Sequence, residues 1–563
     1  MTSAPNPGSD RLRLAELDGL GLSETRIERL LWAFAALGIG LRVLVYLLRF
    51  PIWTDEAKLA VSLLDRGYAG LAEPLAYSQI APVLFLWIQK TASLVFGFSE
   101  FSLRLVPLLA AVSSVLLMRH LARRLSAGPP AVFALAIFAV SYYPVRHGAE
   151  LKPYATDLLA SLALTAIAVE WLREPHRPRW LWRLAAVAPV AVSLSYPAAF
   201  TAAGILAALA VPVWRQGCRA GGPLPAFLSS ALAAAAAFGA SFFFVAARQY
   251  EVRAAGKLPW VGGFPPLDDL PGSLLWLVRA HTGRTFGYPL GGENGGSVLT
   301  FAAFAAGAVV LYRAGERRLL AVLLLPFAAG LGAAVLQRYP YGGSGRVSQH
   351  LVPAICLLAG LGAARLSSLA KREASRRRAQ AGVLVFLAVF GLLLAPAAIL
   401  RPYRDRPDSV GRDFARWFWD TKSRDAELVA AWEDLGLDFA RPPDRWAPGG
   451  AGYRVNQRIY SRRLRRGDAA DLARVSADHP LRVVFLGSAL SGRQEAFAGW
   501  LDDMERRYEL AGRERHRFGG FEEQHGRGDW LELLTFVPRV DALKSEVPRR
   551  DTESELRRQE IPP

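Results

Sequence analysis

Two adjacent carboxylates, Asp55 and Glu56, stand directly after the first long apolar segment of the sequence. The residues 55–66 have an amphipathic helical pattern that Gly67 can end, so both acids are expected in the first turn of a helix at the membrane surface. Carboxylates in such a place can act as general bases or bind cations. A structural role is the alternative, because acids in a first helical turn also stabilise the helix through its dipole.

Three further polar residues, Glu150, Tyr154 and Asp157, are spaced so that they fall on one face of a predicted helix. Asp157 then lies one turn inside an apolar segment, where an ionised carboxylate is costly unless it is paired or faces water. That cost makes Asp157 a candidate functional residue. The alternative is a packing role, in which a buried arginine such as Arg104 neutralises it.

A glycine-rich stretch, residues 338–350, joins two later apolar segments. Its three glycines would let backbone N–H groups approach an anion, and Arg346 could hold a phosphate through two parallel hydrogen bonds. Glycines alone are also typical of an ordinary loop. Arg346 is therefore the informative residue of this stretch.

The composition predicts a helical membrane protein. Of the 563 residues 52% are hydrophobic, and apolar runs of about 15 to 22 residues alternate with arginine-rich loops. The formal charge of +18 does not indicate nucleic-acid binding, because residues 1–400 hold 37 basic against 20 acidic residues and residues 401–563 hold 30 against 29. The excess lies in the loops between spans. With only Cys218 and Cys356, neither a disulfide framework nor a cysteine metal site is expected.

Eleven transmembrane segments are predicted after a polar lead at residues 1–29. They lie near residues 30–50, 101–118, 130–145, 153–170, 184–196, 198–214, 225–246, 298–312, 319–336, 350–368 and 381–400. Residues 83–96 are apolar but would span only about 21 Å as a helix, against a hydrocarbon core of about 30 Å. An interfacial helix on the outer leaflet is expected there.

Basic residues cluster in alternate loops, and this sets the predicted orientation. The cytoplasmic clusters are Arg119, Arg123, Arg124; Arg173, Arg177, Arg179, Arg183; Arg215, Arg219; Arg313, Arg317, Arg318; and Lys371, Arg372, Arg376, Arg377, Arg378. The N-terminus is then cytoplasmic, while the acidic pair, the loops 51–100 and 247–297 and everything after residue 400 lie outside.

Two outer regions complete the predicted organisation. The loop 247–297 is long and rich in glycine, proline and aromatic residues, which is more typical of a functional loop than of a simple connection. Its candidates for stacking on a sugar or anchoring at the interface are Trp260, Trp276, His281, Arg284 and Tyr288. Residues 401–540 contain β-like runs at 428–432 and 482–487 and predict a small α/β domain, followed by a charged, disordered tail at 541–563.

The order of these pieces resembles the GT-C superfamily of integral-membrane glycosyltransferases, specifically bacterial relatives of the dolichyl-phosphate-mannose protein O-mannosyltransferases and of the lipid A aminoarabinose transferases. The resembling residues are Asp55-Glu56-Ala57, the stretch 79–82 leading into 98–107, Glu150 to Tyr154 with Asp157, and Tyr339-Pro340 through Gly345-Arg346 to Pro353. They cover most of residues 30–370. Some relatives have His-Pro-Pro where this chain has Gln79-Ile80-Ala81-Pro82, so a role of that histidine cannot be carried over.

The resemblance implies a GT-C-like fold in a bacterial inner membrane, acting on the cell envelope. It implies transfer of a hexosyl or pentosyl unit from a polyprenyl-phosphate donor to a lipid, glycan or protein acceptor at the outer face, with inversion at the anomeric carbon. An attacking hydroxyl must lose its proton, and Asp55 is the candidate base, with Glu56 beside it.

The departing phosphate needs cations, and Arg346, Lys152 and Arg146 are the candidates because all three fall on outer loops. The residues expected to support the base or the acceptor are Glu150, Tyr154, Asp157, Gln79 and His350. Glu56 and Asp157 could instead hold a divalent cation, Mg²⁺ or Mn²⁺, through oxygen ligands.

Two other classes of membrane protein, a transporter and a non-catalytic scaffold, remain as alternatives, together with a related class of enzymes. A scaffold would not need three charged outer constellations. A lipid-linked saccharide flippase or other transporter would also carry charges within the membrane, but it should show internal repeats with interrupted helices, and none is visible. An O-antigen ligase-like protein would typically rely on arginine- and histidine-based outer loops without an acidic pair after the first span.

The orientation can be tested with reporter fusions. A reporter that is active only outside the cytoplasm should be active when fused after Pro402 and silent when fused after Lys371, because the basic clusters hold their loops in the cytoplasm. Reporter activity in living cells is the measurement. The reverse pattern would place the acidic pair in the cytoplasm and end the glycosyltransferase interpretation.

Overall fold

The structure is a computed structural model. It describes residues 22–126, 128–216, 222–249, 262–291 and 296–400, together with shorter stretches between 412 and 539, the longest being 480–488, 493–516 and 529–539. The tail at 541–563, most of the lead at 1–29, Cys218 and Trp260 lie outside the described residues.

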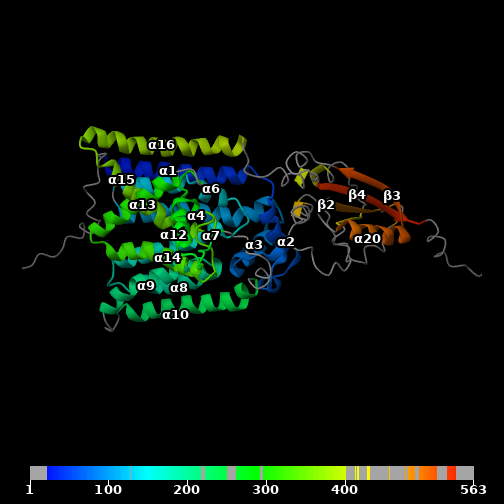
Figure 1. Ribbon diagram of the computed structural model, residues 1–563, viewed down its shortest axis with the longest axis horizontal. Helices are drawn as coiled ribbons and strands as arrows, with labels where there is room; N and C mark the ends of the chain where they lie inside the picture. The colour runs from blue at the N-terminus through cyan, green and yellow to red at the C-terminus, as the bar shows by residue number, and fades with distance from the viewer. Residues whose placement is uncertain are drawn as a thin grey trace, which may run out of the picture. The chain divides into compact units, whose positions relative to one another are not determined.

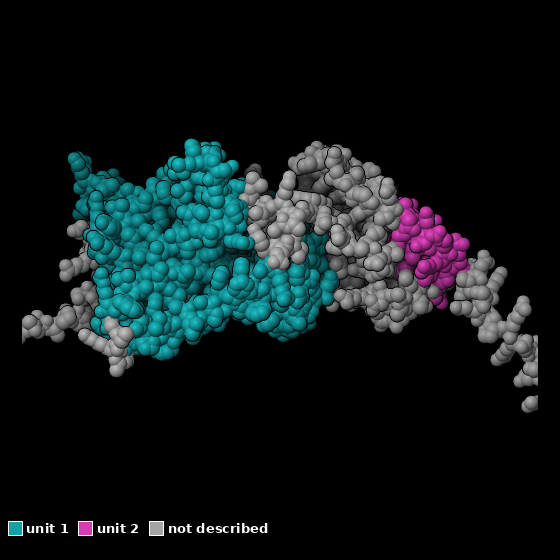
Figure 2. Space-filling view, turned by 60° about the horizontal axis from the view of Figure 1, so that its bottom comes forward, with its two compact units in different colours: residues 1–50, 58–403 teal, residues 51–57, 404–563 magenta. Residues whose placement is uncertain are grey.

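The chain divides into two compact units, which Figure 2 colours separately. Unit 1 comprises residues 1–50 and 58–403, and unit 2 comprises residues 51–57 and 404–563. Unit 1 is a helix bundle that holds almost all of the apolar segments, while unit 2 contains a small sheet.

Within the described ranges, nine helices are long and apolar enough to cross a membrane. They are α1 (Glu24–Leu47), α4 (Glu100–Leu125), α7 (Tyr154–Arg173), α9 (Ala198–Gln216), α10 with its extension (Leu224–Gln249), α13 (Gly296–Arg313), α14 (Arg317–Val335), α15 with its first turn (Gln349–Ser367) and α16 (Glu373–Leu400). Figure 1 shows α1 and α16 side by side along one edge of the bundle and α10 along the opposite edge.

Two of the eleven predicted spans are not among these nine helices. The segment predicted at 130–145 is divided into α5 (Pro129–Ala139) and α6 (Tyr142–His147), and the one at 184–196 is the sixteen-residue helix α8 (Arg179–Leu194). At 1.5 Å per residue α8 reaches about 24 Å. Every residue of α5 is buried, because it packs against α1, α4 and α15. The apolar side chains of α5 therefore contact the protein interior and not the lipid.

The break between α5 and α6 is held by a buried arginine. Arg42 of α1 is fully buried and donates from Nη1 to the carbonyl oxygens of Gly38 at 2.8 Å and Ala139 at 3.0 Å. The last carbonyls of a helix lack partners within the helix, so the guanidinium satisfies one where α5 ends. Its charge also lies over the ring of Phe138, 5.2 Å from the centroid.

Short elements form the α3 end of the bundle, where α2 and α3 lie (Figure 1). The predicted helix at 55–66 is α2 (Thr54–Asp65), and the predicted interfacial helix is α3 (Val83–Val95). Lys90 of α3 donates to the carbonyl of Leu63 at 2.7 Å and so caps the last turn of α2. Burial lowers the pKa of Lys90, with Asp65 opposing that shift.

The remaining helical elements of unit 1 connect the long helices. They are η2 (Ala69–Ala72), η3 (Ala76–Ser78), the π-helix η4 (Phe242–Ala246), α12 (Leu270–Thr282), η5 (Arg284–Phe286) and η6 (Gln349–Leu351), with Val352–Ser367 the regular part of α15.

The described part of unit 2 is a mixed four-stranded sheet with a helix. The order β1 (Leu428–Ala431), β2 (Leu481–Ser488), β4 (Asp529–Pro538), β3 (Tyr508–His516) places β1 parallel to β2 and β4 antiparallel to both of its neighbours. Trp500 and Met504 of α20 (Arg493–Arg507) pack on buried Val483 and Phe536. Both predicted β-runs are strands, and the expected small α/β unit is present.

Two glycines allow α13 and α15 to approach closely. A Cβ atom added to Gly362 of α15 would overlap the carbonyl oxygen of Ala303 in α13, and one added to Gly307 would overlap that of Leu358. Small residues at a contact between membrane helices permit this packing of backbone against backbone. The α13–α15 pair therefore depends on the absence of side chains at both positions.

Gly362→Ala tests this contact. Because a backbone carbonyl cannot give way as a flexible side chain can, we expect a loss of about 1–3 kcal/mol in the free energy of unfolding, visible as a lower midpoint of thermal unfolding in detergent. Gly332→Ala in α14 is the matched control, since an added Cβ has no neighbour within 4 Å there, and we expect it to be neutral or to stabilise by up to about 1 kcal/mol. Equal midpoints for both variants would contradict the packing argument.

Candidate functional site

The predicted acidic pair lies in the first turn of α2. Glu56 is fully buried, and its Oε2 accepts a hydrogen bond from the backbone N–H of Trp53 at 3.3 Å. This contact closes the start of the helix, as a carboxylate in the first turn is expected to do. Asp55 is partly exposed. The two acids therefore differ in exposure: Glu56 is buried, whereas Asp55 is partly exposed.

A buried charge cluster lies just after α5. Glu150 is fully buried and accepts from Arg146 Nε at 2.8 Å, and its second oxygen lies 2.8 Å from Nδ1 of His147. Since a carboxylate only accepts, Nδ1 of His147 carries the proton in this contact. Arg146 also donates to the hydroxyl of Tyr142 at 3.2 Å. Glu150 thus holds the two basic side chains of α6 in fixed positions.

Lys152 and Gln79 meet although 73 residues separate them. Lys152 Nζ donates to Gln79 Oε1 at 2.6 Å, and only 6% of Lys152 is exposed. Gln79 belongs to the loop before α3, at the position where the histidine signature of some relatives is missing. The structure therefore joins two of the predicted site residues from two different loops.

The stretch 338–350 is folded against α6. Its glycine turn contains Gly342 at φ +87° and Gly343 at φ +25°, and a Cβ on Gly345 would lie 2.5 Å from the ring of Tyr143. Gln349 Nε2 donates to the Gly345 carbonyl at 2.8 Å and stabilises the turn. Arg346, partly exposed, follows this close contact directly.

Several charged side chains act on the pKa of His147. Burial lowers this pKa below its usual 6.5 and is the largest cause; the interaction with Glu150 raises it, and the nearby charges of Arg146 and Arg346 lower it further. Two of the three predicted phosphate-binding cations therefore act on one histidine. Lys152, the third, lies two residues after Glu150 in the same loop.

The other predicted supporting residues are buried. The ring of Tyr154 meets that of His147 edge-on, with centroids 4.8 Å apart. Asp157 is 3% exposed, and the side chain of Ser195 acts on its carboxyl group. His350 is enclosed between the rings of Phe200 and Tyr339, a setting for packing more than for binding an acceptor.

In the part of the chain that the structure describes, the predicted metal ligands Glu56 and Asp157 are both buried. No group of three or more His, Cys, Asp or Glu side chains is placed there to bind an ion. Glu56 accepts a hydrogen bond from the Trp53 N–H. We therefore derive no step through a metal.

The aromatic residues of the loop 247–297 pack onto the same region. Trp276 Nε1 donates to the carbonyl of Gly262 at 2.8 Å, and His281 lies 3.1 Å from the hydroxyl of Tyr341. Arg284 donates to the carbonyl of Gly343 at 3.4 Å. The loop thus supports the glycine turn that precedes Arg346. Tyr288 is buried and its ring meets that of Tyr143 edge-on.

Sequence reasoning missed Tyr196 and Gln249. Both side chains reach Ala81 in the loop 79–82. Neither stands in a polar motif; the only sequence signal was the Tyr196-Pro197 break between two short apolar segments.

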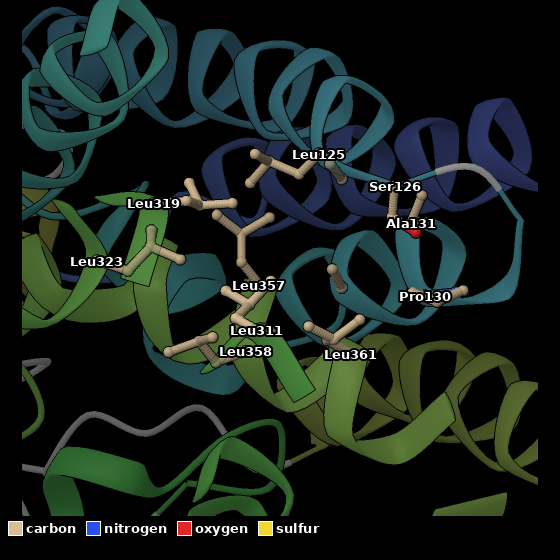
Figure 3. Close-up of a pocket in the computed structure, with 12 residues that line it drawn as sticks. Leu125, Ser126, Pro130, Ala131, Leu311, Leu319, Leu323, Leu357, Leu358 and Leu361 are labelled. Carbon is tan, nitrogen blue, oxygen red and sulfur yellow. The ribbon is translucent and has the colours of Figure 1, made fainter. Parts of the chain in front are cut away.

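A small apolar cavity of about 30 Å³ lies elsewhere in unit 1 (Figure 3). Leu125, Leu319 and Leu357 are among the residues that point into it. It borders the last turn of α4 and the first turn of α5, at the opposite ends of these helices from α3 and α6. The cavity is therefore separate from the polar cluster.

The lowered pKa of His147 gives a pH dependence with a defined sign. Because the folded-state pKa lies below the unfolded value of 6.5, its contribution to stability is complete above pH 6.5 and is lost as the pH falls from there through the folded-state pKa. We expect the unfolding midpoint in detergent to fall between pH 7.5 and pH 5, and to fall less in His147→Gln. His176→Gln, which changes a histidine away from the cluster, should keep the parental profile; equal profiles for parent and His147→Gln would contradict the assignment.

Comparisons with known proteins give a family match and a fold. Residues 81–240 match the family described as Dolichyl-phosphate-mannose-protein mannosyltransferase. No curated protein matches the sequence significantly. Among solved structures, ArnT from Cupriavidus metallidurans bound to undecaprenyl phosphate has a TM-score of 0.53 at 12% identity, over 89% of this chain and 97% of that one. The same protein in the apo state has a TM-score of 0.51 at 12% identity, over 89% and 98%.

Each comparison supports a different part of the prediction. The family match covers the region from α3 to α10, which includes Glu150 and Lys152. The likeness to ArnT extends over most of the chain and shows that the fold is shared. Together they support the predicted resemblance: residues 81–240 are similar to the mannosyltransferase family, and the chain shares the fold of ArnT.

Proposed function

We propose that this protein transfers a sugar from a polyprenyl-phosphate donor to an acceptor hydroxyl at the outer face of a bacterial inner membrane. The observation that carries the proposal is the placement of Arg146 and Arg346 near His147, with Lys152 in the loop that follows α6. The fold is shared with ArnT, which in one of its structures is bound to undecaprenyl phosphate. The leaving group of the proposed reaction is a lipid phosphate, and such an anion needs cations beside it.

The three cations have different roles in the proposal. Arg146 is neutralised by Glu150, so it contributes mainly by shaping the cluster. Lys152, nearly buried beside Gln79, supplies a positive charge in a poorly solvated place, where its attraction to a phosphate is strong. Arg346 is partly exposed and offers the planar fork that pairs with phosphate oxygens.

The proton of the acceptor hydroxyl goes to Asp55 in this proposal. The hydroxyl oxygen attacks the anomeric carbon, the bond from that carbon to the phosphate oxygen breaks, and the lipid phosphate leaves with the electron pair. Attack from the side opposite the phosphate inverts the anomeric carbon. Asp55 is preferred to Glu56 because Asp55 is partly exposed, whereas the buried Glu56 receives the Trp53 N–H.

The orientation belongs to the same proposal. The arginine-rich ends of α4 and α7 are tied to acidic partners, with Arg123 bonded to Glu28 and Arg124 to Glu170. These basic ends lie opposite the ends of the helices that carry the polar cluster. By the positive-inside rule they face the cytoplasm, so the cluster faces outward.

Asp55→Asn tests the proposed base. The amide keeps the size of the side chain but cannot accept the proton, so transfer should fall by about 10² to 10⁴ while the unfolding midpoint stays near the parental value. The measurement is consumption of the host's lipid-linked sugars by the purified protein in proteoliposomes.

Asp65→Asn, at the other end of α2, is the matched control and should keep parental transfer. Glu56→Gln keeps an oxygen for the Trp53 N–H and should lose less activity than Asp55→Asn. Parental transfer by Asp55→Asn would reduce Asp55 to a helix-stabilising acid and move the search for the base to Asp157.

A further inference from the structure

The loop that carries Gln79 is short and has few internal hydrogen bonds. Ala81 is fully buried and is followed by Pro82, which has no N–H and precedes α3. A buried backbone N–H or C=O needs a hydrogen-bond partner. Without one, the group loses its hydrogen bond to water on folding and gains nothing in return, which destabilises the fold. In Ala81 both backbone groups find partners on distant side chains.

Gln249 and Tyr196 are those partners. The N–H of Ala81 donates to Gln249 Oε1 at 3.1 Å, and the carbonyl of Ala81 accepts from the hydroxyl of Tyr196 at 3.1 Å. The same hydroxyl lies 3.4 Å from Gln249 Oε1. Because a hydroxyl has a single proton, we assign its hydrogen bond to the shorter contact, the one with the Ala81 carbonyl. One residue of the loop is therefore held on both sides, from the α8–α9 turn and from the end of the α10 extension.

A π-helical turn directs Gln249 toward this contact. The α10 extension passes through the π-helix η4 before it reaches Gln249, which is 1% exposed. A π-turn inserts one extra residue, and each residue of a helix turns the chain by about 100°, so without it Gln249 would point to another side. The side chains of Phe243 and Phe244 in the π-turn are about two-thirds exposed, so their own packing does not require the extra residue.

We infer that Gln249 and Tyr196 are positioning residues of the site, and that the π-helix η4 exists to aim Gln249 at Ala81. By holding Ala81, they fix Gln79 two residues earlier, and Gln79 in turn holds Nζ of Lys152 at 2.6 Å. The effect on the donor phosphate rests on the proposed function; the effect on the loop does not.

The loop can be examined by amide hydrogen exchange of the purified full-length protein in detergent. Gln249→Met has nearly the same size but no acceptor, so the Ala81 amide should exchange at least about tenfold faster than in the parent. Gln249→Glu keeps an oxygen at the same place and should restore protection. Deletion of Phe243 should also expose the Ala81 amide, because it removes the extra residue of the π-turn. Unchanged exchange in Gln249→Met would overturn the inference.

Tyrosine variants supply the matched control. Tyr196→Phe should loosen the loop, whereas Tyr46→Phe should leave it unchanged, because Tyr46 donates at 3.0 Å to a different backbone carbonyl, that of Phe101. Binding of undecaprenyl phosphate is the second readout: Gln249→Met should bind it several-fold more weakly than Gln249→Glu. Faster exchange with parental binding would overturn the positioning role. A parent that binds no undecaprenyl phosphate would count against the proposed function alone, since the exchange result stands without it.

Discussion

The cost of burying polar groups away from water governs the arrangement of unit 1. A charge or an unpaired backbone group costs several kcal/mol in an apolar interior. Arg42 shows the consequence most directly, because its fully buried guanidinium lies on the carbonyls where α5 ends. The two burial costs offset each other, because the carbonyl groups at the helix end need hydrogen-bond donors and the arginine needs acceptors. The resulting break allows α6 to start in a new direction and to carry Arg146 and His147.

The same constraint explains why the polar cluster is internally paired. Glu150 is buried with two basic neighbours, Lys152 with the amide of Gln79, and Ala81 with Tyr196 and Gln249. Groups that are held in this way lose little further freedom when a charged ligand arrives. Burial has forced the polar groups of this site to pair, and the pairing fixes their positions in advance. Such a site suits the proposed reaction, in which charge develops on a departing phosphate.

The comparisons and the site geometry answer different questions. The likeness to ArnT concerns the course of the helices, whereas the identity of 12% leaves the side chains of the site to be judged by their own contacts. Those contacts separate the predicted residues. Arg346 and Asp55 are partly exposed, whereas Glu150 and Glu56 are buried and accept hydrogen bonds from Arg146 and from the Trp53 N–H.

The sequence by itself determined the class of protein, most helices, both predicted strands and the polar residues worth attention, because apolar length, periodicity and charge placement are local properties. Only the tertiary structure decided that α5 is a short buried helix, since lipid and protein interior select the same apolar residues. It alone decided which distant side chains meet: Lys152 contacts Gln79, and Gln249 reaches Ala81. Such pairings depend on which distant helices pack together and on one extra residue in a π-turn, and no local pattern encodes them.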